Sequence, residues 1–537
     1  MNSTHGLSDH WGTQVVRRGA HPPYLTYTDR WRSVCGFLSD ARRWGEREYL
    51  VESERRLTFD EFLGCVEAAK GKLVDEHGVR IGDRVLLFGA NSADWIVAFF
   101  AVLASGAAVV SGNAWWSPKE LDHALAVASP VLVIADDRRA AMAPAGQPVM
   151  RLPLDLASTR TIRLGEVDDH LFDEEQPAIV LFTSGTTGAP KAASLSHRSV
   201  IANQQNFLVA TRRLPSELGS DHEGAIALVT VPLFHMGGIQ SILATLLTGG
   251  KVVLHVGRFE AATILRLIEA ERIQSWGGVP TMIGRVIDHP DLKLRDTSSL
   301  RSVTVSGTSV SPQLIEQVRQ AFPTARRNAG TIYGMTEAGG TLTVATGKDL
   351  ASRSGTVGRP FPVVELKIED PDISGRGEII ARSPTNMTEY LGSLEPCVVD
   401  PAGWLHTGDI GRIDDDGYLF IEGRNKDVII RGGENIACPN VEAALIEHPA
   451  VAEVAVIGLP DDEFGEVVAA VVVPRDGIEV TPNELEAFAS ERLAYFEVPS
   501  RWWLRREQLP TNATGKVVKQ PLREAWPIDD ERNVTSK

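Results

Sequence analysis

The chain has 537 residues, more than one compact hydrophobic core usually contains, so we expect at least two domains. Its 54 basic and 70 acidic residues give a net charge of −16, and an acidic surface of this size disfavours binding to nucleic-acid phosphates. The first residues lack the apolar segment of a signal peptide, and the apolar run 95–110 is too short to span a membrane. The four cysteines form no CxxC pair, which favours reduced thiols over a metal site. We therefore expect a cytoplasmic protein without nucleic-acid or integral-membrane contacts.

Predicted helices and strands alternate along the first part of the chain. The sequences at 58–61 (Thr-Phe-Asp-Glu) and 117–120 (Ser-Pro-Lys-Glu) have the capping-box pattern that begins a helix. The segment 84–88, apolar after its first residue, and the continuous apolar runs at 131–134 and 179–182 predict strands that are buried on both faces. This alternation predicts an α/β fold in which helices cover largely parallel sheets.

The last hundred or so residues follow a different pattern. Short predicted strands at 453–456 and 467–473 alternate with helices, which indicates a small separate α+β domain. A polar stretch at 423–427 separates two apolar runs. We therefore predict a large N-terminal domain of residues 1–424 and a C-terminal domain of residues 425–537.

A loop dense in glycine and hydroxyl residues follows the strand predicted at 179–182. Glycines allow backbone N–H groups to approach phosphate oxygens, hydroxyls add donors, and Lys191 adds positive charge. The spacing differs from a Walker A loop, because Lys191 lies three residues after Gly188. The predicted phosphate-binding residues are Thr183, Ser184, Gly185, Thr186, Thr187, Gly188 and Lys191.

This loop resembles the phosphate-binding motif of the adenylate-forming superfamily, which includes acyl-CoA synthetases, peptide-synthetase adenylation domains and luciferases. Further matches follow in the family's order, so that the resemblance extends from about Leu57 to Lys516. It implies ATP and coenzyme A as substrates, Mg²⁺ as the metal, and a small mobile C-terminal domain. One departure is Ala192, where the family usually has glycine after the lysine.

The sequence Tyr-Gly-Met-Thr-Glu at 333–337 is similar to the family's YGxTE motif. The resemblance implies that Tyr333 stacks on adenine, Thr336 binds the α-phosphate and Glu337 holds Mg²⁺. A flat ring suits a base, and a hard carboxylate oxygen suits Mg²⁺. The sequence Ser-Gly-Thr-Ser at 306–309 resembles the loop beside adenine, where the family often has Gly-Gly-Ala-Pro. The contacts of this 306–309 loop with adenine therefore differ here. Other residues implied in the adenine site are Ser306, Gly307, Thr308 and Gly334.

Motifs near the domain boundary also resemble family motifs. Asp409 would accept hydrogen bonds from both ribose hydroxyls, and Arg424 would support the nucleotide. Lys426 lies where the family turns its small domain, and Gly432 and Gly433 resemble the loop beside the pantetheine tunnel.

The C-terminal sequence around Thr-Gly-Lys, ending at Lys516, resembles the family's catalytic-lysine motif. Lys516 would bridge the substrate carboxylate and the α-phosphate while the adenylate forms. Rotation about Lys426 would then withdraw Lys516 and bring the Gly433 loop to the site for transfer to the thiol.

Residues 232–235 (Pro-Leu-Phe-His) resemble the aromatic motif beside the acyl pocket. His235 stands where amino-acid-activating domains usually have aspartate, which disfavours an amino-acid substrate. Small residues near the expected pocket leave room for a long or bulky acid, although turns explain them equally well. The predicted acyl-pocket residues are Phe234, His235, Gly277, Gly278, Gly339 and Gly340. We expect a fatty or other hydrophobic acid, with an aryl acid as the next choice.

Several alternatives remain open from the sequence. The acceptor of the acyl group could instead be a carrier-protein thiol, an amine or another nitrogen nucleophile. A luciferase-like oxygenase and a non-catalytic nucleotide-binding protein are further alternatives, and retention of Lys191, Glu337, Asp409 and Lys516 argues against the latter. The sequence leaves the oligomeric state open, and a homodimer is compatible with it.

Overall fold

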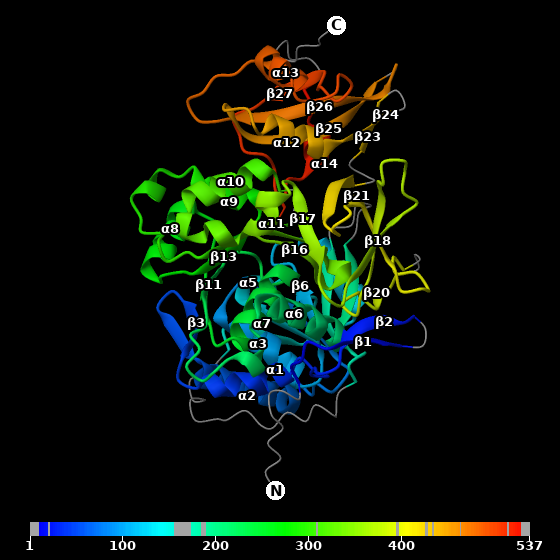
Figure 1. The fold of residues 1–537 in the computed structure, drawn as a ribbon. Coiled ribbons are helices and arrows are strands. Elements are labelled where there is room, and N and C mark those ends of the chain that lie inside the picture. Colours follow the sequence, from blue (N-terminus) through cyan, green and yellow to red (C-terminus); the bar gives the residue numbers. More distant parts are fainter. Residues whose placement is uncertain are drawn as a thin grey trace.

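The protein is described from a computed structural model, in which the large N-terminal domain carries the small C-terminal domain at one end (Figure 1). The structure describes residues 10–19, 22–154, 173–183, 190–307, 310–393, 397–424, 428–431, 434–461, 463–512 and 515–527. A two-stranded hairpin, β1 (Val15–Arg18) and β2 (Tyr24–Tyr27), precedes the main sheets.

The first main sheet has seven strands in the order β20-β10-β9-β6-β5-β7-β8. Pairing is parallel from β9 through β6, β5 and β7 to β8, and antiparallel from β9 through β10 to β20. The strands are β5 (Arg84–Phe88), β6 (Ala108–Gly112), β7 (Leu132–Asp136), β8 (Val149–Leu152), β9 (Pro177–Thr183), β10 (Lys191–Ser196) and β20 (Glu389–Leu391).

The second sheet has thirteen strands in the order β18-β19-β21-β22-β17-β16-β15-β14-β13-β11-β12-β3-β4. Its middle part, from β15 to β3, is parallel, and antiparallel strands extend it at both ends. The strands are β3 (Glu48–Glu52), β4 (Arg55–Thr58), β11 (Ile226–Val229), β12 (Lys251–Leu254), β13 (Ser275–Gly278), β14 (Ser302–Val305), β15 (Ala329–Met335), β16 (Gly340–Ala345), β17 (Thr356–Pro360), β18 (Glu365–Glu369), β19 (Gly377–Arg382), β21 (Leu405–Ile413) and β22 (Leu419–Arg424).

Helices cover both sheets, as the alternating pattern predicted. Both predicted capping boxes are present, with Thr58 capping α2 and Ser117 capping α4. The N-terminal helices are α1 (Gly36–Ala41), α2 (Phe59–Gly71), α3 (Ala93–Ala104), α4 (Pro118–Ala128), α5 (Asp137–Ala140), α6 (His197–Thr211), α7 (Met236–Leu247), α8 (Ala261–Ala270), α9 (Pro280–Ile287), α10 (Pro312–Ala321) and α11 (Gly347–Ser352). Short 3₁₀ turns lie at Arg42–Trp44, Pro215–Glu217, Pro290–Lys293, Pro323–Asn328 and Thr336–Ala338, and a π-helical turn lies at Lys72–Glu76.

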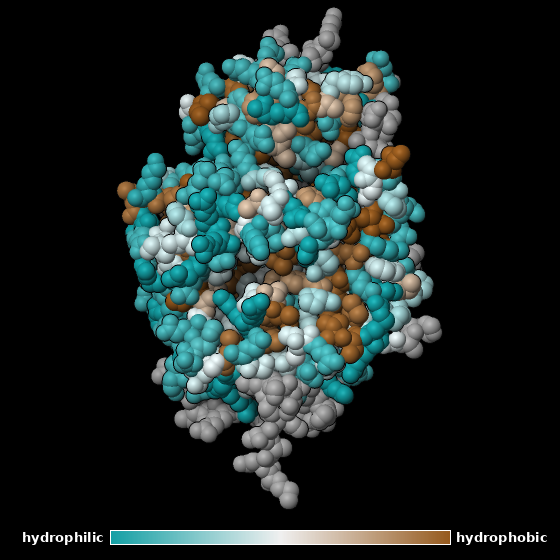
Figure 2. Space-filling view, viewed as in Figure 1, coloured by the Kyte–Doolittle hydropathy of each residue, from teal (hydrophilic) through white to brown (hydrophobic). Residues whose placement is uncertain are grey.

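One hydrophobic core joins the two main sheets. It contains Leu87 of the first sheet, Val252 of the second and Phe99 of α3, all fully buried. The exterior is largely hydrophilic on the face shown in Figure 2, with smaller hydrophobic patches between. Within the described part of the chain, no helix is both long and apolar enough to cross a membrane.

The C-terminal domain has its own five-stranded sheet, with the path β24-β23-β26-β25 and β27 paired to β26. Its core includes Val441, Leu485 and Trp502, which confirms the predicted α+β unit. The elements are β23 (Val428–Arg431), β24 (Glu434–Ala437), α12 (Cys438–Leu445), β25 (Val451–Asp461), β26 (Gly465–Pro474), α13 (Pro482–Ser490), β27 (Arg501–Leu504) and α14 (Lys519–Glu524). We propose the domain boundary after residue 424, because β22 ends there in the large sheet and β23 belongs to the small one.

The C-terminal domain contacts the large domain at α9 and its end. Arg285 Nη2 lies 3.2 Å from Glu453 Oε1, and Arg475 Nη1 lies 2.7 Å from Asp288 Oδ2. Figure 1 shows this domain above α9 and α10. These contacts hold the C-terminal domain, which carries Lys516, against the large domain.

Candidate active site

Two residues predicted to bind the nucleoside meet in the second sheet. Tyr333 near the end of β15 donates its hydroxyl to Asp409 Oδ2 on β21 at 2.8 Å, although the two residues are 76 positions apart. Both side chains are buried, and Thr407 Oγ1 accepts a hydrogen bond from the Asp409 backbone at 3.0 Å. In the strand register Arg424 lies opposite Asp409. The structure therefore brings the residues predicted for adenine and ribose to one place.

The residues predicted to bind phosphate and metal gather around a side chain that the sequence did not reveal. Glu337 lies in the 3₁₀ turn after β15 and is only 8% exposed. Tyr390 on β20 donates its hydroxyl to Glu337 Oε1 at 2.7 Å, and Lys191 Nζ lies 5.3 Å from the centre of the Tyr390 ring. Lys191 begins β10, directly opposite Thr183 at the end of β9. The pairing of β10 with β20, a contact between segments far apart in the sequence, brings Tyr390 here.

Some predicted residues lie outside the described part of the chain, and their roles stay predictions. They are Ser184, Gly185, Thr186, Thr187, Gly188, Thr308, Lys426, Gly432 and Gly433. The side chain of Arg424 belongs with them.

The loop that carries Lys516 is docked on α9. Thr281 Oγ1 donates to the backbone oxygen of Gly515 at 3.0 Å, and Asn512 Oδ1 accepts from the Lys516 N–H at 3.0 Å. Gly515 has φ +80°, and a Cβ there would come within 2.8 Å of Val279, so glycine suits this close approach. A Cβ built on Gly307 would lie 3.7 Å from Lys516 Cε, so the lysine chain passes beside the loop predicted to contact adenine.

His235 lies close enough to Lys516 for the lysine charge to act on the imidazole. Burial, together with the positive charge of Lys516, lowers the pKa of His235 to about 4. The imidazole is therefore neutral at pH 7. Among the residues that the structure describes, its buried Nε2 has no hydrogen-bond partner. A neutral ring nitrogen in this position can hydrogen-bond to a substrate oxygen without adding charge.

The glycines predicted to line the acyl pocket fall into two groups. Added Cβ atoms at Gly277 and Gly278 would find their nearest neighbours at 3.7 and 3.4 Å, which is ordinary van der Waals contact, so both positions could accept a Cβ without overlap. In contrast, Gly339 and Gly340 have φ +68° and +121°, and Cβ atoms there would overlap Thr385 and Gln240. Tight packing and positive φ therefore account for Gly339 and Gly340, whereas neither constraint applies at Gly277 and Gly278.

An exposed aromatic side chain extends the wall at Phe234. The ring of Trp115 meets that of Phe234 edge to face at 5.3 Å, and Phe234 lies 4.5 Å from the His235 ring. Trp115 is 60% exposed, which is unusual for so large an apolar side chain. Its place before the capping box at 117–120 gave no signal for this contact in the sequence.

Two family models match this chain. The model described as AMP-binding enzyme matches residues 37–391, and the model described as AMP-binding enzyme C-terminal domain matches residues 440–516. The chain belongs to the AMP-binding enzyme family.

Relatives of this AMP-binding enzyme include two bacterial ligases. A feruloyl-CoA synthase from Amycolatopsis is 36% identical over 469 residues, covering 83% of this chain and 89% of the relative. A 3-[(3aS,4S,7aS)-7a-methyl-1,5-dioxo-octahydro-1H-inden-4-yl]propanoyl:CoA ligase from Mycobacterium tuberculosis is 35% identical over 518 residues, covering 90% of this chain and 96% of the relative.

Solved structures share the complete fold. ATP-bound MatB from Rhodopseudomonas palustris matches with a TM-score of 0.81 and 26% identity, covering 92% of this chain and 99% of that one. The amide bond synthetase McbA from Marinactinospora thermotolerans matches with a TM-score of 0.79 and 28% identity, covering 92% and 100%. The protein is thus an AMP-forming acid–thiol ligase, which activates a carboxylic acid as the acyl-adenylate and transfers the acyl group to coenzyme A.

Proposed function

We propose that this ligase activates a bulky hydrophobic carboxylic acid, and that acids bearing a ring are the first class to test. The observation that carries this proposal is the edge-to-face contact of the exposed Trp115 ring with Phe234, in the motif predicted to flank the acyl pocket. Aromatic rings pack well against other apolar rings. The two bacterial relatives are named for acyl groups that carry rings, which supports the same class.

In the first half-reaction, the carboxylate oxygen attacks the α-phosphorus of ATP and pyrophosphate leaves. Both reactants are anionic, so positive charge must balance them at the point of attack. We propose that Lys516 supplies this charge from the docked C-terminal domain, and that His235 donates a hydrogen bond to the acid. Tyr333 and Asp409 hold the nucleoside end of ATP.

Mg²⁺ fits the donors near the phosphate site. The described residues contain no group of three or more His, Cys, Asp or Glu side chains that could hold a metal ion by themselves. Mg²⁺ usually takes one or two carboxylates together with substrate phosphates, and the Glu337 carboxylate provides such a ligand. When bound, the ion would neutralise phosphate charge beside Lys191 and Thr336.

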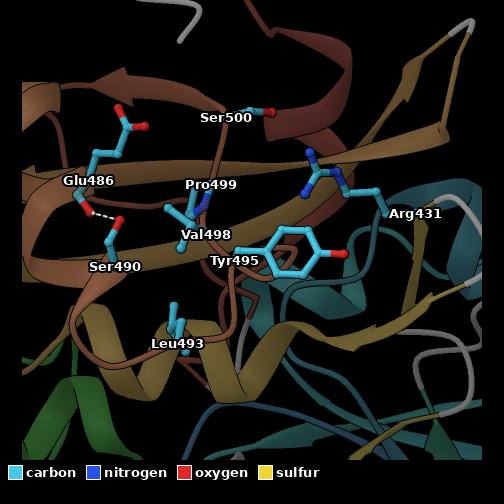
Figure 3. Close-up of a pocket in the computed structure, with 8 residues that line it drawn as sticks. All are labelled: Arg431, Glu486, Ser490, Leu493, Tyr495, Val498, Pro499 and Ser500. Carbon is cyan, nitrogen blue, oxygen red and sulfur yellow. Dashed lines mark hydrogen bonds between the residues drawn. The ribbon is translucent and has the colours of Figure 1, made fainter. Parts of the chain in front are cut away.

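In the second half-reaction, the thiol of coenzyme A attacks the acyl carbon and AMP leaves. We propose that rotation near Lys426 removes Lys516 and presents the face that contains Gly432 and Gly433. The C-terminal domain also has an open pocket of about 350 Å³ (Figure 3), lined by Arg431, Glu486, Ser490, Leu493, Tyr495, Val498, Pro499 and Ser500.

The chemistry of this pocket supports coenzyme A rather than a carrier protein as the acceptor. Tyr495 is 86% exposed and offers a ring face to a base, while the neighbouring Arg431 guanidinium suits a phosphate. Because Arg431 directly precedes Gly432, a nucleotide bound here would lie close to the proposed entrance for the thiol. The site is built from one chain, so the proposal holds for a monomer and for a homodimer.

We further propose that the enzyme works in the cytoplasm. None of the four cysteines forms a disulfide, and Cys35, Cys65 and Cys438 are buried, as expected for thiols in a reducing compartment.

A panel of carboxylic acids tests the proposed substrate class. Pyrophosphate release is measured for ring-bearing, straight-chain and short acids, each with and without coenzyme A, and the thioester is identified by mass. We expect ring-bearing hydrophobic acids to give the highest kcat/KM. A clear preference for short or charged acids would refute the proposed class.

A further inference from the structure

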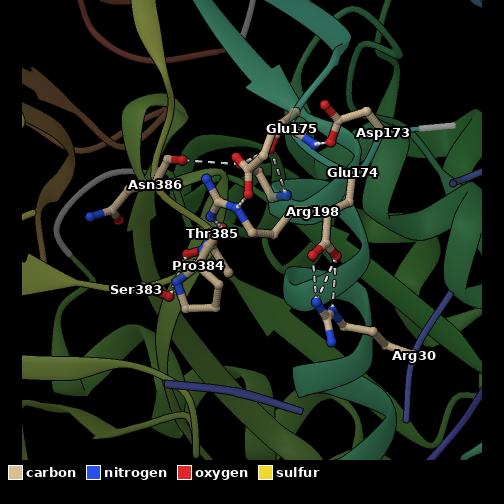
Figure 4. Close-up of polar contacts among 11 residues, drawn as sticks. Arg30, Asp173, Glu174, Glu175, Arg198, Ser383, Pro384, Thr385 and Asn386 are labelled. Atoms are coloured by element: carbon tan, nitrogen blue, oxygen red, sulfur yellow. Dashed lines mark hydrogen bonds and ion pairs between the residues drawn. The ribbon is translucent and has the colours of Figure 1, made fainter. Parts of the chain in front are cut away.

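A short segment that follows β19 and ends with β20, residues 383–391, connects several parts of the phosphate site; we call it the 383–391 strap. Its start is fixed to α6. The Arg198 guanidinium is buried, donates to the backbone oxygen of Pro384, and pairs with Glu175 Oε1 at 2.8 Å. Figure 4 shows Arg198 between Glu175 and the turn of Pro384 and Thr385. The strap thus begins from a backbone that a paired cation holds in place.

The middle of the strap is tied to both sides of the site. Met387 N–H donates to the backbone oxygen of Glu337 at 2.8 Å, and Thr388 N–H donates to Ser194 of β10 at 2.9 Å. Tyr390 then lies opposite Ala193 in the register of β10 with β20. These bonds fix the position of Tyr390 relative to both the Glu337 turn and the strand that starts with Lys191.

The Tyr390 side chain contacts the two charged residues of the phosphate site. Its hydroxyl binds one oxygen of Glu337 at 2.7 Å, which restricts the rotation of that carboxylate. Its ring face lies 5.3 Å from the Lys191 ammonium, a distance at which a ring attracts a cation. One side chain therefore restrains an anion and a cation of the same site.

We propose that Tyr390 is a positioning residue for adenylate formation, which holds Glu337 and Lys191 in the orientation that receives the triphosphate. The inference rests on the proposed function in one respect, since it takes ATP to bind at this site. Preorganised charges stabilise a transition state because they need not reorganise as the reaction proceeds. Even a small displacement of such groups lowers the reaction rate substantially.

The test is Tyr390→Phe, which removes the hydroxyl and keeps the ring beside Lys191. The matched control is Tyr418→Phe, because Tyr418 donates a similar bond to Asp349 at 2.9 Å outside the proposed site. Two half-reactions are measured for each variant: acid-dependent exchange of pyrophosphate with ATP, and transfer from supplied acyl-AMP to coenzyme A. Thermal unfolding shows whether each variant is folded.

A binding measurement keeps the test independent of turnover. Electron paramagnetic resonance of Mn²⁺ with α,β-methylene-ATP reports the affinity of the ion for the enzyme–nucleotide complex. We expect Tyr390→Phe to weaken this affinity and to slow adenylation about 10-fold to 100-fold, as for other hydrogen bonds to a charged group. Transfer from acyl-AMP should stay within about twofold of the wild type, since it involves no triphosphate, and Tyr418→Phe should change none of these values.

The outcomes separate this inference from the proposed function. Unchanged Mn²⁺ affinity together with normal adenylation in a folded Tyr390→Phe variant would overturn it, as would equal losses in both half-reactions. If the wild type activated no carboxylic acid, the proposed function would fail, while Mn²⁺ affinity would still decide whether Tyr390 positions the metal-binding carboxylate.

Discussion

The Tyr333 hydroxyl donates to Asp409 Oδ2 at 2.8 Å, so one hydrogen bond links the residues assigned to the base and the ribose. Tyr333→Phe keeps the ring but removes this donor from a buried carboxylate. We expect the KM for ATP to rise about 10-fold, in line with the loss of a hydrogen bond to a charged group. Steady-state pyrophosphate release measures the change. ATP should stay strongly preferred over GTP, and equal use of GTP by the wild type would contradict the adenine site.

Lys516→Ala should separate the two half-reactions. Removing one preorganised electrostatic contact typically costs about 10²–10³ in rate, so adenylation should fall by that factor. Transfer from supplied acyl-AMP should remain, because the lysine has no role after pyrophosphate leaves. Lys519→Ala is the control, since Lys519 lies three residues further on and pairs with Glu442 at 2.9 Å. Equal losses in both half-reactions for Lys516→Ala would contradict the alternating-domain assignment.

Gly278→Leu should narrow the range of acids. An added Cβ would meet Ile283 at 3.4 Å, an ordinary van der Waals contact, so the backbone can accept a side chain that would extend into the predicted acyl pocket. We expect bulky ring-bearing acids to lose kcat/KM while the KM for ATP and the unfolding temperature stay nearly unchanged. Competition between a large and a small acid measures the shift directly, and an unaltered preference would remove Gly278 from the acyl pocket.

Tyr495→Ala should weaken the binding of coenzyme A without affecting adenylation. A base stacked on an aromatic ring typically contributes about 1–3 kcal/mol, so the KM for coenzyme A should rise at least about fivefold. Kinetics with coenzyme A and with a pantetheine thiol lacking the nucleotide provide the comparison. The variant and the wild type should use the truncated thiol equally well. A similar rise in KM for both thiols would exclude nucleotide binding at Tyr495.

Lowering the pH should destabilise the folded protein through protonation of His197. This buried residue accepts the Val34 N–H at Nδ1, and burial lowers its pKa to about 4. The unfolded chain, with a histidine pKa of about 6.5, then binds more protons than the folded one between these values, so stability falls as pH decreases through that range. From pH 7 to pH 5 the loss is about 2 kcal/mol. In His197→Asn the side-chain oxygen can replace Nδ1. The free energy of unfolding of this variant, measured in urea, should depend less on pH over this range.

Asp40 should have the opposite effect on the pH dependence of folding stability, which provides an internal check on the sign. Burial raises its pKa to about 6, although Trp11 and Trp31 both donate to its carboxylate. The folded state therefore gains a proton as pH decreases through 6, which contributes stability at low pH that is lost as pH rises. Asp40→Asn should accordingly steepen the decline between pH 7 and pH 5 by about 1 kcal/mol. A flatter profile in this variant would contradict the sign.

Local sequence signals predicted the elements well, because their causes are local. The capping boxes at Thr58 and Ser117 depend on residues three positions apart, and both are present. Tyr390 and Trp115 could not be found in this way, since strand pairing and ring packing between distant segments bring them to the site. Glycine itself is ambiguous in sequence. At Gly278 an added Cβ would make only ordinary contacts, whereas at Gly340 glycine permits close packing against Gln240.

The strand β13 ends at Gly278 and leads almost directly into α9, which receives the C-terminal domain. One short piece of chain therefore starts at a residue predicted to line the acyl pocket and supports the docked Gly515 and Glu453 contacts along its length. If the acid binds at Gly278 as predicted, an acid that displaces this residue would also displace the base of the helix on which the lysine-bearing loop rests. The fit of the acid would then be coupled to the position of Lys516, so that a poorly fitting acid would lose catalytic rate as well as affinity.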